Sequence, residues 1–148
     1  MSSIQKITPY LWFDHQAEEA ALFYCSIFKN SKVISSSPMI VEFEIEGLKF
    51  IGLNGGPRYK FSEATSFFVL CENQDEVDHY WGKLISNGGE EGPCGWLKDK
   101  YGLSWQIVPK RFTEMMNSGD AEKVNRVLDV MKDMKKMIIA DFERVYNS

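Results

Sequence analysis

Short stretches of the chain alternate between apolar and polar side chains, which is the pattern of a β-strand with one face against a core and one in water. The clearest example is residues 40–46, where Val41, Phe43 and Ile45 alternate with glutamates that we expect on a solvated outer face. Further strands are predicted at residues 32–35, 48–54, 90–92, 95–99 and 103–108. Between the last two, Lys100-Tyr101-Gly102 includes a glycine that can supply the positive φ of a short hairpin turn.

Two other segments repeat apolar residues at helical spacing. They are Ala20, Phe23, Tyr24, Ile27 and Phe28 in the first, and Val77, Tyr80, Trp81, Leu84 and Ile85 in the second. Each set forms one apolar stripe, which predicts a helix packed on a sheet. We expect Asp14 to cap the first helix and Asn73, with Glu76 three residues later, to cap the second. Asn87-Gly88-Gly89 is a stop signal for the second helix.

The same order of elements occurs twice. Residues 8–13 match residues 65–70 in character, 57 positions later, and the two helical stripes match at the same separation. The closing strands match at a separation of 55, as a difference in loop length would produce. The predicted fold class is therefore α+β, with two βαβββ modules at about residues 4–57 and 64–109 of a single domain spanning residues 1–109.

The last part of the chain, residues 110–148, is predicted to be a helical extension. We expect one long helix from Asp120 to about Tyr146, because apolar residues recur there at alternating spacings of three and four: Val124, Val127, Met131, Met134, Ile138, Phe142 and Val145. This stripe needs a covering surface, and either the chain's own sheet or a second subunit would provide it. The second possibility, together with open sheet edges, favours a homodimer.

Composition and charge narrow the possible partners. The 148 residues carry a net charge of −4, so we expect no nucleic-acid partner. The chain shows neither a secretory leader pattern nor a run of about 18 apolar residues, so we expect no membrane partner. Cys25, Cys71 and Cys94 are odd in number and lack CxxC spacing, which favours reduced thiols and a cytoplasmic location.

Four motifs are similar to those of a known family. They are ITPYLWFD at 7–14, FYCSIF at 23–28, FIGLNGGP at 50–57 and GWLKDKYGLSWQIVP at 95–109. They resemble the PhnB-like branch of the glyoxalase/bleomycin-resistance/dioxygenase, or vicinal oxygen chelate, superfamily, whose members are often described as 3-demethylubiquinone 3-methyltransferase-like. The resemblance implies two βαβββ modules that form a cupped mixed sheet, usually in a homodimer, with a site inside the cup.

The resemblance also implies where metal ligands would lie, namely on the first and last strands of each module. Residues 7–9 and 64–66 on the first strands offer no strong ligand, and the closing strands offer Ile51 and Gln106, with Asn54 nearby. One amide oxygen does not replace the charge of carboxylates. We therefore expect no metal and no cofactor. Methyl transfer is not expected either, because neither glycine doublet lies between a strand and a helix, where a methyl donor such as S-adenosylmethionine is commonly held.

The side chains expected to line the cup are Leu11, Phe13, Asn54, Ser66, Phe68, Trp96, Ser104 and Gln106. In the last strand Gln106 is placed on the cavity face and Trp105 in the core between helix and sheet. The loop at 54–57 contains two glycines, which fits either close backbone approach to a ligand or a plain wide turn. His15 and His79 are expected in solvent, Cys25 and Cys71 as buried inert thiols, and no catalytic residue is identified.

These features predict a binder of a small, largely apolar or aromatic molecule that works without a metal, or an enzyme of weakly defined turnover. Two alternatives remain open. One is a metal-assisted lyase, isomerase or dioxygenase that uses Gln106, and the other is a structural homodimer whose terminal helix is the functional surface.

Overall fold

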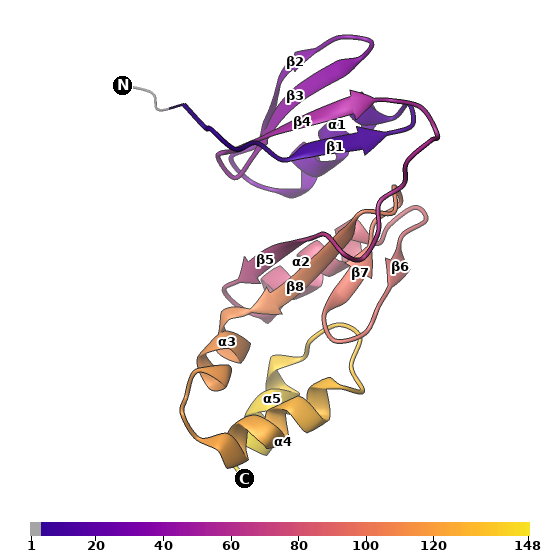
Figure 1. Cartoon of the computed structure of the whole chain (residues 1–148). Helices are drawn as coiled ribbons and strands as arrows, with labels where there is room; N and C mark the ends of the chain where they lie inside the picture. Colours follow the sequence, from indigo (N-terminus) through magenta and orange to yellow (C-terminus); the bar gives the residue numbers. More distant parts are fainter. Residues whose placement is uncertain (1–3) are drawn as a thin grey trace. The chain divides into compact units, whose positions relative to one another are not determined.

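The computed structural model describes residues 4–148, and the chain divides into two units, Met1–Phe61 (unit 1) and Ser62–Ser148 (unit 2) (Figure 1). Each unit has its own four-stranded mixed sheet with helices, so the α+β class is confirmed. Within residues 4–148 no helix combines the length and the apolar character needed to cross a membrane.

Unit 1 is one βαβββ module. Its elements are β1 (Tyr10–Phe13), α1 (Ala17–Ile27), β2 (Lys32–Ser36), β3 (Ile40–Ile45) and β4 (Leu48–Asn54). The strand order is β1-β4-β3-β2, with β1 parallel to β4 and the other pairs antiparallel. Alternate residues of β3, Val41, Phe43 and Ile45, are buried, and the Phe43 ring stacks on Tyr24 of α1. The period-2 pattern thus correctly predicted which face of β3 meets the helix.

Unit 2 repeats this topology. Its module consists of β5 (Ser66–Cys71), α2 (Gln74–Leu84), β6 (Glu90–Glu91), β7 (Trp96–Lys98) and β8 (Ser104–Pro109), with strand order β5-β8-β7-β6. Strand β5 is parallel to β8, as β1 is to β4. The internal repeat inferred from the sequence is therefore a repeat of structure.

The two helices begin differently. The Asn73 side chain accepts a hydrogen bond from Glu76 N at 3.0 Å, which confirms the predicted cap of α2. The predicted cap of α1 is wrong: α1 begins after Gln16, and Ala17 N donates to Asn54 Oδ1 at 2.8 Å. The first helix is thus capped by the end of β4, a residue distant in sequence that no local pattern could indicate.

A buried carboxylate holds the turn between β7 and β8. Asp99 is only 2% exposed, and its Oδ1 accepts from the backbone N–H groups of Tyr101 and Leu103 at 2.9 and 3.1 Å. Its Oδ2 accepts from Trp105 Nε1 at 2.9 Å. Gly102 has φ of 86°, the positive φ expected for this turn.

The single long helix predicted for residues 120–146 is wrong. The chain forms α3 (Lys110–Met116), α4 (Ala121–Met131) and α5 (Ile139–Tyr146). Between α4 and α5 the carbonyls of Met134 and Lys135 accept hydrogen bonds from Cys94 N and Gly95 N, both at 2.8 Å. Tertiary hydrogen bonds therefore interrupt the helix where the sequence contains neither proline nor glycine.

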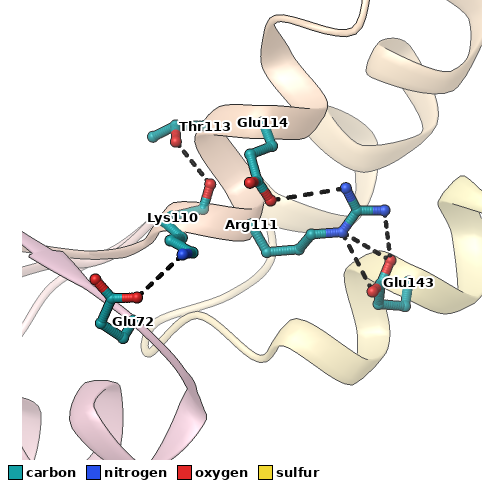
Figure 2. Close-up of polar contacts among 6 residues, drawn as sticks. All are labelled: Glu72, Lys110, Arg111, Thr113, Glu114 and Glu143. Carbon is teal, nitrogen blue, oxygen red and sulfur yellow. Dashed lines mark hydrogen bonds and ion pairs between the residues drawn. The ribbon is translucent and has the colours of Figure 1, made fainter.

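These three helices pack on their own unit. Their buried residues Met115, Val127 and Phe142 form one cluster with Met137, from the segment between α4 and α5, and with Val108 of β8. Ion pairs add to this packing: Arg111 contacts both oxygens of Glu143, and Lys110 Nζ lies 3.0 Å from Glu72 Oε2 (Figure 2). Unit 2 thus covers much of the apolar stripe, so an exposed stripe no longer argues for a homodimer, which stays a prediction.

Candidate functional site

The candidate site is the face of the unit 2 sheet that lies opposite α2, here called the helix-free face. On the α2 side, Trp105 and Ile107 of β8 are buried, as predicted for Trp105. Side chains alternate along each strand, so Gln106 lies on the other face. Phe68 of β5 and Trp96 of β7 are the direct register partners of Gln106. These three side chains form a row across three strands, here called the aromatic row.

Gln106 is held in one orientation by a neighbour on this face. Its Nε2 donates to Ser66 Oγ at 2.9 Å, and the Gln106 side chain is half-buried. This bond uses the amide nitrogen and directs the amide oxygen to other donors. The structure thus brings together Ser66, Phe68, Trp96 and Gln106, four of the residues expected to bind a ligand.

A groove of about 360 Å³ runs beside the aromatic row. Its sheet side is formed by the aromatic row and Val108, and its other side by Phe112, Met116 and Met131 of the C-terminal helices. Phe68 is 53% exposed. The sequence interpretation did not place these helices at the site, because the contacts of α3 and of the end of α4 with the sheet join residues that are distant in sequence.

Leu11 and Phe13 lie on the face of the unit 1 sheet that packs on α1, which corrects the expectation that they line the cup. They are 6% and 2% exposed and face α1. A Cβ atom added at Gly52, the register partner of Leu11, would lie 3.3 Å from Ala17 Cβ of α1 and 3.4 Å from the Phe13 ring. The error is a one-residue slip: Tyr10 pairs with Ile51 as Phe68 pairs with Gln106. A slip of one moves every side chain of a strand to the other face.

Asn54 and the loop that follows it have structural partners. Asn54 caps α1 through Oδ1 and donates from Nδ2 to Pro38 O at 2.9 Å. A Cβ atom at Gly55 would lie 2.4 Å from the Trp12 ring, and Trp12 Nε1 donates to Gly56 O at 2.8 Å. The group that approaches these glycines closely is therefore an indole of the same chain.

The helix-free face of unit 1 contains a carboxylate that the sequence interpretation placed in outer solvent. Glu42 pairs in register with Ile51, whose other neighbour is Tyr10, so these three side chains share the face opposite α1. Val41 and Phe43, on either side of Glu42, are fully buried toward the helix. The alternation in the sequence was read correctly, but the polar side of β3 is the helix-free face of the sheet.

Cys94 lines the groove, whereas Cys25, Cys71 and both histidines lie outside it. Burial raises the pKa of the Cys71 thiol to about 12, the negative charge of Glu76 adds to this effect, and a backbone hydrogen bond from Val108 opposes it. Burial also raises the pKa of Cys25. Neither of these two thiols therefore has the environment of an activated nucleophile. The His15 side chain is 76% exposed, and His79 is exposed on α2.

Comparison with known proteins identifies the family. A family model described as 3-demethylubiquinone-9 3-methyltransferase matches residues 5–108. The chain belongs to this family, the PhnB-like group predicted from the motifs. It is 32% identical to the PhnB protein from Bacillus cereus, covering 71% of this chain and 99% of that one, with a TM-score of 0.63. A comparison with curated proteins found no match.

More distant structures share the fold. A protein from Pseudomonas aeruginosa is 17% identical, with a TM-score of 0.58 over 72% of this chain and 98% of that chain. The fosfomycin resistance protein FosX from Listeria monocytogenes, solved with Mn(II) and sulfate, is 19% identical, with a TM-score of 0.55 over 72% of this chain and 91% of that chain. This PhnB-like protein therefore has the glyoxalase-like fold.

The residues of this PhnB-like protein do not fit the metal ion or the methyl donor that the names of its relatives imply. Within residues 4–148 no three His, Cys, Asp or Glu side chains gather as metal ligands would. The paired positions on the first and last strands carry Tyr10 with Ile51 and Phe68 with Gln106, so Gln106 supplies the one amide ligand among them. For a methyl donor, Gly55-Gly56 follows a strand but leads into a loop, and Gly88-Gly89 follows a helix.

Proposed function

We propose that this PhnB-like protein binds a small, largely apolar or aromatic molecule at the aromatic row of unit 2 and does so without a metal. The observation that supports this proposal is the row itself: two aromatic rings flank an oriented amide, beside a groove of about 360 Å³. Ligand sites are typically concave and mostly apolar, with a few placed polar groups.

The chemistry of the row favours a ring that carries one hydrogen-bond donor. Phe68 and Trp96 offer aromatic faces for stacking, and a ring pair contributes about 0.5–1.5 kcal/mol beyond its buried area. Because Ser66 engages the Gln106 amide nitrogen, the amide oxygen is directed toward a donor on the ligand. A phenol has both features, so 4-ethylphenol is a suitable probe and 4-ethylanisole, which lacks the O–H, is its matched analogue.

Isothermal titration calorimetry on the full chain tests the proposal. We expect Trp96→Ala to weaken 4-ethylphenol binding by about 3- to 10-fold, the equivalent of one lost aromatic pair. Gln106→Leu should weaken the phenol by a similar factor through the lost hydrogen bond and leave the anisole unchanged. Leu22→Ala is the control, because Leu22 is an apolar side chain that is 55% exposed on α1 and does not line the groove.

Two results would contradict the proposal. The first is an unchanged dissociation constant for the phenol in both Trp96→Ala and Gln106→Leu. The second is an equal loss in Leu22→Ala, which would mean that the probe binds to exposed apolar side chains in general. Circular dichroism of each variant verifies that the fold is retained. We expect the Gln106→Leu variant to keep the fold, since Gln106 lies outside the core.

A further inference from the structure

A second hollow, of about 380 Å³, opens on unit 2 and shares Trp96 with the groove described above. Its lining includes Glu63, Glu90, Lys98 and Ser104, and we call it the polar pocket. In register Lys98 pairs with Ser104 on one side and with Glu90 on the other, so these three side chains share the helix-free face. None of the binding described for the aromatic row uses Glu63, Glu90 or Lys98.

The polar pocket has an excess of negative charge. Glu63 and Glu90 line it against one lysine, Lys98, whereas the carboxylate of Glu91, a further lining residue, accepts from Trp81 Nε1 of α2 at 2.9 Å. The Lys98 ammonium is already paired with Glu63, and the hydrogen bond between them lowers the pKa of Glu63 and raises that of Lys98. Lys98 is therefore not available for an anion, and the unpaired charge of the pocket favours a cation.

Ser104 supplies an independent observation that indicates a ligand. It is 1% exposed and lines the pocket, and its Oγ has no hydrogen-bond partner within residues 4–148. Buried hydroxyls are nearly always bonded, because a buried hydroxyl without a partner loses its hydrogen bonds to water. The neighbouring Ser66 hydroxyl is bonded to Gln106, so the sheet provides a partner for one serine of this face and not for the other.

Trp96 and Pro93 give the polar pocket an apolar wall. The face of an indole attracts organic cations within about 6 Å of the ring. An ammonium group with a short apolar body therefore matches all three parts of the pocket: its charge complements Glu90, its N–H reaches a hydroxyl acceptor, and its body lies on the indole.

We propose that the polar pocket binds a small protonated amine, with the ammonium group between Glu90 and the Ser104 hydroxyl and the apolar body against Trp96. Because Ser104 is 1% exposed and Lys98 is its register partner on the same face, entry requires the Lys98 side chain to move. This movement is small in cost, because the Lys98 and Glu63 side chains are 38% and 64% exposed, and exposed ion pairs contribute little stability. The proposal shares Trp96 with the aromatic row but does not depend on the binding proposed there.

Titration calorimetry with benzylammonium chloride, using benzyl alcohol as the uncharged analogue, tests this site. We expect the ammonium to bind at least about tenfold more tightly than the alcohol, because only the cation gains from Glu90. Glu90→Gln should weaken the ammonium at least about fivefold and Ser104→Ala at least about threefold. Glu122→Gln is the control for the charge change, because Glu122 lies on α4 with an 87% exposed side chain and does not line the pocket.

Thermal unfolding of Ser104→Ala separates a ligand-binding role from a structural one. If the hydroxyl lacks a protein partner, its removal leaves the midpoint temperature of unfolding unchanged or raises it. A lowered midpoint would show that the protein itself uses the hydroxyl and would overturn the proposal. So would equal affinity for benzylammonium and benzyl alcohol, or full benzylammonium affinity in Glu90→Gln.

Gln106→Leu distinguishes this proposal from the proposed function. It should abolish the preference for 4-ethylphenol over 4-ethylanisole and leave benzylammonium binding unchanged. Loss of benzylammonium binding in Gln106→Leu would mean that the two hollows are one site, which contradicts a separate amine pocket.

Discussion

Asp99 offers the sharpest test of how the sheet of unit 2 is held. Its carboxylate accepts from Tyr101 N, Leu103 N and Trp105 Nε1, in a position that is 2% exposed. Asp99→Ala leaves these three donors without their acceptor, and each buried donor that loses its partner costs about 1–3 kcal/mol. Relaxation of the turn lets water reach part of this group, so we expect a loss of about 3–5 kcal/mol in the free energy of unfolding.

Two conservative variants divide this loss. Asp99→Asn retains an oxygen for the two backbone donors but places an NH₂ group against the Trp105 indole N–H, so it should cost about 1–2 kcal/mol. Trp105→Phe removes the indole donor and should cost a similar amount plus the lost contacts. Because both variants break the same bond, the double variant should be less destabilised than the sum of the two by about 1 kcal/mol.

Urea titration of the full chain, followed by far-UV circular dichroism and by tryptophan fluorescence, measures these values. Coincidence of the two signals checks that one transition is being compared. A loss below about 1 kcal/mol in Asp99→Ala would refute the reasoning, because even one unsatisfied buried donor costs about that much. Strict additivity of Asp99→Asn and Trp105→Phe would show that the indole and the carboxylate are not coupled.

Three further predictions concern the thiol, the metal and the oligomeric state. The pKa of the Cys71 thiol is raised from 9.0 to about 12 in the folded protein, so between these pH values the thiol ionises only in the unfolded state. The free energy of unfolding should therefore fall as pH rises from 9 toward 12, and it should fall less steeply in Cys71→Ala. An equal slope in urea titrations of the two proteins would contradict this. Protein purified without chelator should contain far less than one equivalent of Zn, Ni, Mn or Fe; stoichiometric metal that is lost in Gln106→Ala would favour the metal-dependent alternative. We predict a homodimer in sedimentation velocity, since β1 and β5 are edge strands of their sheets, and a monomer at every concentration would refute it.

Local patterns in the sequence predicted most of the secondary structure because their causes are local. The alternation in residues 40–46 reflects the pleat of a strand, and the stripe through Val77, Trp81 and Leu84 reflects the helical period. The Asn73 cap and the Gly102 turn depend on neighbours within a few residues. The βαβββ order in both halves followed from these elements alone.

The faces of the first strand could not be assigned from the sequence, because β1 consists of only four residues, all apolar or aromatic. A pattern without polar residues fits either parity, and only pairing with β4 and packing on α1 place Leu11 and Phe13 in the core. The same limit applies to Asn54. Its role as a cap depends on Ala17, which lies 37 positions away in the sequence.

The site depends on tertiary structure in the same way. The sequence correctly grouped Ser66, Phe68, Trp96 and Gln106, because they alternate within three strands whose pairing the repeat predicts. It did not predict the break between α4 and α5, where Cys94 and Gly95 bond to Met134 and Lys135. The amino-acid sequence by itself determined the periods and the repeat, whereas long-range hydrogen bonds and packing decided which helices border the groove and left Ser104 Oγ without a partner among residues 4–148.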